Sequence, residues 1–147
     1  MDYEPRLAIG GWGENPALDR ARLQIHLDAL VASNVAILRA YPDFPRIYSG
    51  VVWYRSPEDQ CNGCDDDDPW SDAEAARRQG FVDCEDAAAW LAAERIVRDG
   101  IPARVAFRIV YDARARRQRI HVTIETDTRR DGSWIGREDP ALVLGMK

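Results

Sequence analysis

Long apolar runs are missing from this sequence of 147 residues. No stretch approaches the ~18 consecutive apolar residues that a membrane-spanning helix needs, so we expect no membrane partner. The opening residues also lack the basic segment followed by an apolar run that marks a signal peptide, so nothing directs the chain to an oxidising compartment. An excess of positive charge is missing too, because the formal net charge is -5. We therefore expect no nucleic-acid partner.

Cysteine and histidine are scarce, with three and two residues. An odd number of cysteines argues against a disulfide framework and leaves at least one thiol for another role. Cys61 and Cys64 have the spacing of half a zinc site, but no second Cys-x-x-Cys pair exists and neither histidine is close in sequence. A disulfide or two loop thiols fit this pair better than a zinc-stabilised binding module. We expect no metal and no cofactor.

Both cysteines fall in an irregular segment, 56–71, that is long for a connection inside a compact domain. Four consecutive carboxylates, Asp65–Asp68, follow them, and clustered oxygen ligands are what calcium favours. The run lacks the alternating spacing and the central glycine of an EF-hand loop. We interpret it as a solvated acidic loop.

The composition is typical of a soluble globular protein, with 46% hydrophobic and 31% charged residues, and the length suits one domain, 1–147. A helix is predicted over about 16–40, because Asn15 is a favourable cap, Pro16 suits the first helical position and leucines recur at helical spacing. We expect this helix to pack as scaffold on a core formed by residues 46–147.

The remaining pattern predicts helical segments first and a sheet afterwards. The elements expected are a strand over 46–54, a short helix over 71–79, a helix over 83–99, and strands over 105–111, 120–125 and 134–139. The main helix has Asp83 as its cap and Gly100 as a left-handed stop. This order predicts an α+β fold.

Three residues of this arrangement can carry chemistry. Cys84 begins a helix, where the positive end of the helix dipole stabilises a thiolate and lowers the thiol pKa. His121 lies mid-strand on the face opposite its apolar neighbours, and a base is what an activated thiol requires. Asp139 ends the next strand and can fix the imidazole tautomer through a hydrogen bond. Alone, each has a structural interpretation, as a buried cysteine, a strand histidine and an Asp-Pro turn, but together they favour a nucleophile site.

The segment 80–90, GFVDCEDAAAW, resembles the Gly-Asp-Cys-(Asp/Glu)-Asp-(Leu/Ala)-Ala segment of the transglutaminase-like, papain-related cysteine peptidase superfamily. Segment 100–105 is similar to that family's turn into its central sheet. His121 matches its strand histidine and Asp139 its Asp-Pro element, at separations of 37 and 18 residues. The resemblance covers roughly residues 54–146 and departs from the family pattern at Phe81-Val82, between the glycine and Asp83.

This resemblance implies a papain/transglutaminase-like fold, with the cysteine at the N-terminus of a helix packed on an antiparallel sheet. It also implies that Cys84, His121 and Asp139 form a catalytic triad. Gln79, Trp70 and Tyr54 are candidates for the oxyanion site or the cleft wall, and the backbone N–H of Cys84 is a further candidate donor.

More narrowly, the chain resembles the short members of this superfamily that bacteriophages and prophages encode. That resemblance implies cysteine-dependent acyl transfer at an amide bond, on a peptide or peptidoglycan-like substrate, with hydrolysis and transamidation both open. A catalytically weak or inactive structural phage tail or assembly component on the same fold is the alternative. The protein would then be cytoplasmic in the host or virion-associated, with phage tail or assembly proteins as partners.

Overall fold

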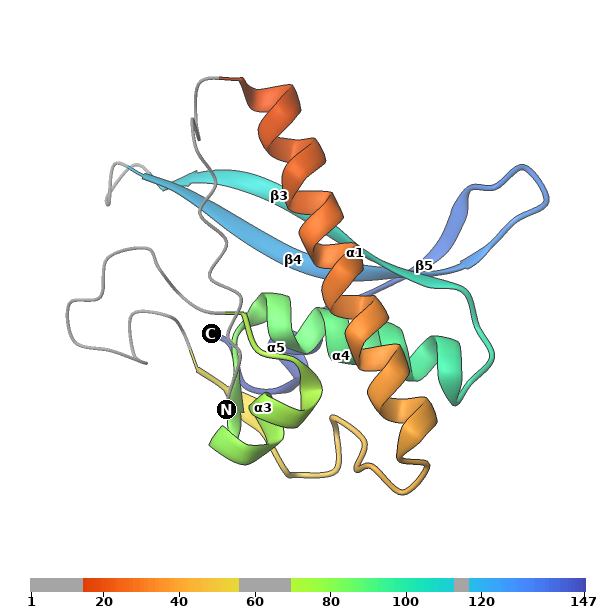
Figure 1. Cartoon of the computed structure of the whole chain (residues 1–147). Coiled ribbons are helices and arrows are strands. Elements are labelled where there is room, and N and C mark those ends of the chain that lie inside the picture. Colours follow the sequence, from red (N-terminus) through yellow and green to blue (C-terminus); the bar gives the residue numbers. More distant parts are fainter. Residues whose placement is uncertain (1–14, 56–69, 113–116) are drawn as a thin grey trace.

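The computed structural model of the chain describes residues 15–55, 70–112 and 117–147, and it has a mixed α+β architecture (Figure 1). In chain order the elements are α1 (Pro16–Ala40), β1 (Trp53–Tyr54), α3 (Ala73–Gln79), β2 (Phe81–Val82), α4 (Cys84–Val97), β3 (Ala103–Asp112), β4 (Arg117–Thr128), β5 (Trp134–Glu138) and α5 (Pro140–Val143). A helix packed on an antiparallel sheet is therefore confirmed. The segment with Cys61, Cys64 and Asp65–Asp68 lies outside the described residues.

The main sheet has the strand order β3-β4-β5, with both pairs antiparallel. β4 pairs with β3 along most of its length, including Arg108 opposite His121. β5 pairs only with the C-terminal part of β4, from Thr128 to Ile124. On the N-terminal side of Ile124, β5 no longer covers this edge of β4.

α4 lies across one face of this sheet, and the long helix α1 crosses both α4 and the sheet (Figure 1). α4 is alanine-rich, and five of its alanines are fully buried: Ala87, Ala88, Ala89, Ala92 and Ala93. Such small side chains let neighbouring backbones approach closely. Leu23, Leu27 and Leu38 of α1 are buried in the same core.

The helix ends follow the capping residues that the sequence indicates. The Asn15 side chain accepts a hydrogen bond from the backbone N–H of Leu18 at 3.2 Å, and Asp83 accepts one from Asp86 at 3.0 Å. α4 ends at Val97, two residues before the predicted end, and Gly100 adopts a left-handed φ of 64°. Only glycine takes this conformation at no steric cost.

The predicted strand over 46–54 is wrong for most of its length, because only Trp53–Tyr54 is extended and residues 47–51 form turns. The reason is tertiary. The backbone N–H of Ile47 donates a 2.6 Å hydrogen bond to the buried carboxylate of Glu94 on α4, so it is not available for a strand ladder. The short strand that remains, β1, pairs in parallel with β2, with Trp53 opposite Phe81.

Glu94 is 2% exposed, and this burial raises the pKa of its carboxyl group. The Ile47 N–H and the nearby Arg46 and Arg98 act in the opposite direction but do not outweigh burial. A carboxyl whose pKa is raised by folding stabilises the protein fully at low pH, and that contribution is lost as the pH rises through the raised value. The contribution of Glu94 to the stability of the fold therefore falls as the pH rises.

Candidate functional site

The start of α4 places the thiol of Cys84 against the main sheet. Cys84 is 9% exposed. Its Sγ lies 3.2 Å from Oε2 of Glu85 and 3.8 Å from the backbone oxygen of Ile120, the two acceptors that the thiol proton can reach. Ile120 is on β4, at the level where β5 no longer covers the strand edge. The helix N-terminus thus brings Sγ beside the backbone that flanks His121.

The pKa of the Cys84 thiol is raised, whereas the sequence predicted that it would be lowered. Burial raises the pKa of the Cys84 thiol, and the carboxylates of Glu85 and Asp83 raise it further, while the backbone of Val122 acts in the opposite direction. A helix N-terminus contributes the equivalent of about half a positive charge. Desolvation together with two neighbouring carboxylates outweighs that half charge, so Cys84 is a neutral thiol in this conformation.

His121 and Asp139 form a direct hydrogen bond. Nε2 of His121 lies 2.6 Å from Oδ2 of Asp139, and the two side chains are 17% and 20% exposed. Asp139 follows the last residue of β5, and its other carboxylate oxygen caps α5 by accepting from the backbone N–H of Leu142 at 3.4 Å. The capping bond fixes the carboxylate, and the carboxylate orients the imidazole.

The structure thus places Cys84 beside the backbone that flanks His121 and joins His121 to Asp139 by a hydrogen bond, and we call these three residues the Cys–His–Asp cluster (Cys84, His121 and Asp139). They come from the start of α4, the middle of β4 and the turn after β5. His121 uses Nε2 for Asp139, so Nδ1 is the ring nitrogen that remains to receive a proton. Cys84 and His121, both within the described residues, share no hydrogen bond in this conformation.

The three candidates for an oxyanion or cleft residue lie on segments around the start of α4. The Gln79 side chain donates to the Phe81 backbone oxygen at 3.0 Å and to Ser71 Oγ at 3.3 Å, so its amide is engaged locally. Trp70 stands edge-on to the ring of His26 on α1, with ring centroids 6.3 Å apart. Tyr54 is opposite Val82 on β2.

Two charged contacts of this region were not anticipated from the sequence. Glu85 follows the cysteine and binds its thiol, and the only sequence signal for this contact was a carboxylate next to the cysteine that begins the helix. Arg95 on α4 binds Glu138, the residue before Asp139, with hydrogen bonds of 2.9 and 2.5 Å. Because these residues lie 43 positions apart, no local pattern predicts that they meet.

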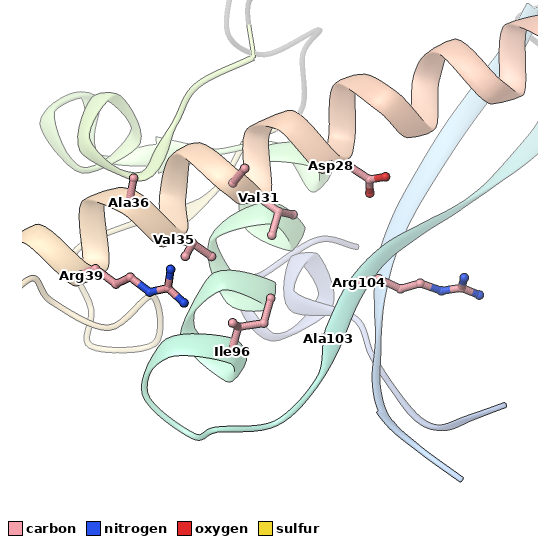
Figure 2. Close-up of a pocket in the computed structure, with 9 residues that line it drawn as sticks. Asp28, Val31, Val35, Ala36, Arg39, Ile96, Ala103 and Arg104 are labelled. Carbon is pink, nitrogen blue, oxygen red and sulfur yellow. The ribbon is translucent and has the colours of Figure 1, made fainter. Parts of the chain in front are cut away.

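Two concave surfaces lie away from the Cys–His–Asp cluster. A groove of about 420 Å³ runs between α1, the end of α4 and the start of β3, with Val31, Val35 and Ile96 as its apolar floor (Figure 2). A second, of about 510 Å³, lies over the β4–β5 hairpin beside Trp134. Neither includes a member of the cluster.

Within residues 15–55, 70–112 and 117–147, no three His, Cys, Asp or Glu side chains are grouped so as to hold a metal ion. Across the same part of the chain, no helix is both long and apolar enough to cross a membrane. Comparisons of the chain with protein-family models, with curated proteins and with solved structures found no match.

Proposed function

We propose that this protein is a cysteine-dependent enzyme of the transglutaminase-like, papain-related class that transfers the acyl group of an amide bond. The observation that carries the proposal is the 2.6 Å hydrogen bond between His121 and Asp139, formed beside the strand edge that receives Sγ of Cys84. A nucleophile, a base and a residue that orients the base are the three parts that such chemistry requires. The substrate is a peptide or peptidoglycan-like amide.

In the proposed reaction, Sγ of Cys84 attacks the amide carbonyl carbon while Nδ1 of His121 accepts the thiol proton. The tetrahedral intermediate collapses to a thioester, the C–N bond breaks, and His121 returns the proton to the leaving amine. Water or a second amine then attacks the thioester and releases the thiol, giving hydrolysis or transamidation. Asp139 holds Nε2–H throughout, so that Nδ1 stays unprotonated before each attack.

Because Cys84 is a neutral thiol in this conformation, proton transfer to His121 has to accompany or immediately precede attack on the substrate. The negative oxygen of the intermediate needs donors, and the backbone N–H groups at the first turn of α4 have no partners within the helix. The N–H of Cys84 belongs to this set.

The alternative proposal is a structural phage tail or assembly component with little or no catalysis. The observations in its favour are the 9% exposure of Cys84, its raised thiol pKa, and a His121 ring that is not hydrogen-bonded to it. A buried cysteine that serves only packing is expected to react slowly and to be unaffected by a nearby imidazole.

Thiol labelling separates the two proposals. In a Cys61→Ser/Cys64→Ser background Cys84 is the one cysteine left, and its rate of reaction with iodoacetamide is measured between about pH 6 and 10. The enzyme proposal predicts that His121→Ala slows labelling near neutral pH, while His26→Ala, the matched control at the chain's other histidine, does not. Equal rates in all three proteins would support the structural alternative.

Turnover is tested with fluorescent casein for hydrolysis and with dimethylcasein plus a fluorescent primary amine for transamidation. The enzyme proposal predicts that Cys84→Ala abolishes whichever activity is found without unfolding the protein. Activity retained by Cys84→Ala would overturn the assignment of the nucleophile.

A further inference from the structure

An ion pair joins the helix that carries the nucleophile to the strand end that precedes the aspartate. Arg95, eleven residues after Cys84 on α4, donates from Nε to Oε2 of Glu138 at 2.9 Å and from Nη2 to Oε1 at 2.5 Å. Its remaining nitrogen, Nη1, donates to Asp99 at 2.8 Å. The guanidinium is therefore held at both ends, and a bidentate pair of this kind fixes geometry as well as charge.

The position of this pair matters because the sheet stops there. Glu138 is the last residue of β5 and is opposite Ile124, the last pairing between β5 and β4. Asp139 comes next, outside the ladder, so strand pairing does not hold it. The chain at this point is fixed on one side by Arg95 binding Glu138, and on the other by Asp139 capping α5.

Tyr48, in the segment before β1, lies close enough to this strand end for its pKa to respond to the charges there. Burial raises the pKa of Tyr48 to about 12, and the carboxylates of Glu138 and Asp139 contribute to the increase while Arg95 opposes it. The Tyr48 hydroxyl thus lies within the field of both carboxylates and of the guanidinium that binds one of them.

We propose that Arg95 is a positioning residue that, through its bidentate hydrogen bonds to Glu138, holds Asp139 within hydrogen-bond distance of His121 Nε2. This proposal deepens the proposed function, since it assigns the residue that keeps His121 in the tautomer a general base requires. Its central prediction concerns the imidazole alone and does not depend on finding a substrate.

The test is the exchange of the His121 Nε2 proton with solvent, measured by NMR on protein labelled with ¹⁵N in histidine, at a pH where the ring is neutral. Arg95→Met removes the donors and keeps an apolar stem. Loss of a hydrogen bond to a charged group is expected to speed exchange about tenfold and to reduce the fraction of ring with the proton on Nε2. Arg104→Met is the matched control, because Arg104 binds Glu125 on the same sheet at 2.9 and 3.1 Å.

A second background separates positioning from a general loss of stability. In Asp139→Ala the Nε2 hydrogen bond is already absent, so adding Arg95→Met should change neither the exchange rate nor the tautomer further. If Arg95→Met does not fold, Glu138→Gln removes the partner's charge from the other side and carries the same prediction. Wild-type exchange in the folded variant, an equal change in Arg104→Met, or an undiminished effect in Asp139→Ala would each overturn the proposal.

If amide turnover is found, Arg95→Met should lower kcat with little change in KM, because Arg95 does not touch the substrate. If His121→Ala leaves the labelling rate of Cys84 unchanged but exchange responds as predicted, the positioning role stands and the enzyme proposal fails. The two ideas can therefore be rejected separately.

Discussion

Replacing Glu85 by glutamine isolates one cause of the raised Cys84 thiol pKa. The thiol lies 3.2 Å from Oε2 of Glu85, and that carboxylate disfavours the thiolate by its charge and by accepting the thiol proton. Glutamine has nearly the same shape and keeps an oxygen acceptor, but it carries no charge. Glu85→Gln should therefore increase the thiolate population at Cys84 with little change in packing.

The size of the effect follows from the separation of the two charges. Unit charges 4 Å apart interact by about 1 kcal/mol in water and about 4 kcal/mol at an effective dielectric constant of 20. Glu85 is partly exposed, so we take a value near the lower limit, about 1.4 kcal/mol, which corresponds to about ten times more thiolate. A thiolate of lower pKa is also a weaker nucleophile, with a Brønsted coefficient of about 0.4–0.5, which reduces the gain in rate to about threefold.

The assay is iodoacetamide labelling of the single-thiol protein at about pH 7, with mass spectrometry to follow the modified fraction. Glu74→Gln is the control for a change in net charge, because Glu74 is an exposed residue on α3 and makes no hydrogen bond to Cys84. We expect labelling about three times faster in Glu85→Gln and unchanged in Glu74→Gln. An unchanged or slower rate in Glu85→Gln would show that the charge of Glu85 does not help to keep the thiol protonated.

Two further predictions concern the fold. Glu94→Gln should become more stable relative to wild type as the pH rises from below about 4.5 to 7, because burial raises the pKa of Glu94 and its contribution to stability is lost in that direction. Urea unfolding at several pH values measures the difference in free energy of unfolding between the two proteins. A difference that stays constant with pH would contradict the prediction. Gly136→Ala should lose about 1–3 kcal/mol of stability, because its new Cβ would lie 2.5 Å from Oγ1 of Thr126. Thr126→Ala should recover most of that loss, and no recovery in the double variant would refute the steric explanation.

Local chemistry was enough to predict most of the elements, and it singled out Cys84, His121 and Asp139 as residues that can carry chemistry. Asn15 and Asp83 mark helix starts because their side chains satisfy backbone N–H groups that the helix leaves open. Strand alternation separates His121 from its buried neighbour Val122. These features depend on residues close together in the sequence, so a single sequence is sufficient to recognise them.

The features that the sequence did not predict depend on contacts between distant segments. The strand expected over 46–54 was lost because a buried carboxylate from α4, Glu94, binds the backbone of Ile47. The thiol pKa of Cys84 was predicted with the wrong sign, because the helix position was visible in the sequence but the degree of burial was not. The Arg95–Glu138 pair joins two elements 43 residues apart, and no periodicity encodes such a contact.

The cost of the His121–Asp139 pair favours a role in chemistry over a role in folding. Both side chains are about four-fifths buried, and apolar residues at such positions are often as stabilising as a buried ionisable pair. The Asp139 carboxylate has a folding role as the cap of α5, but folding does not by itself require that an imidazole bind this carboxylate. The neutral state of Cys84 is compatible with catalysis, since the thiol needs to lose its proton only when a substrate arrives. In the proposed mechanism, Glu85 acts on the thiol that gives this proton, and Arg95 acts through Asp139 on the imidazole that receives it. An enzyme should therefore respond to substitution of both Glu85 and Arg95. A structural protein should show no change in thiol reactivity when His121 is removed.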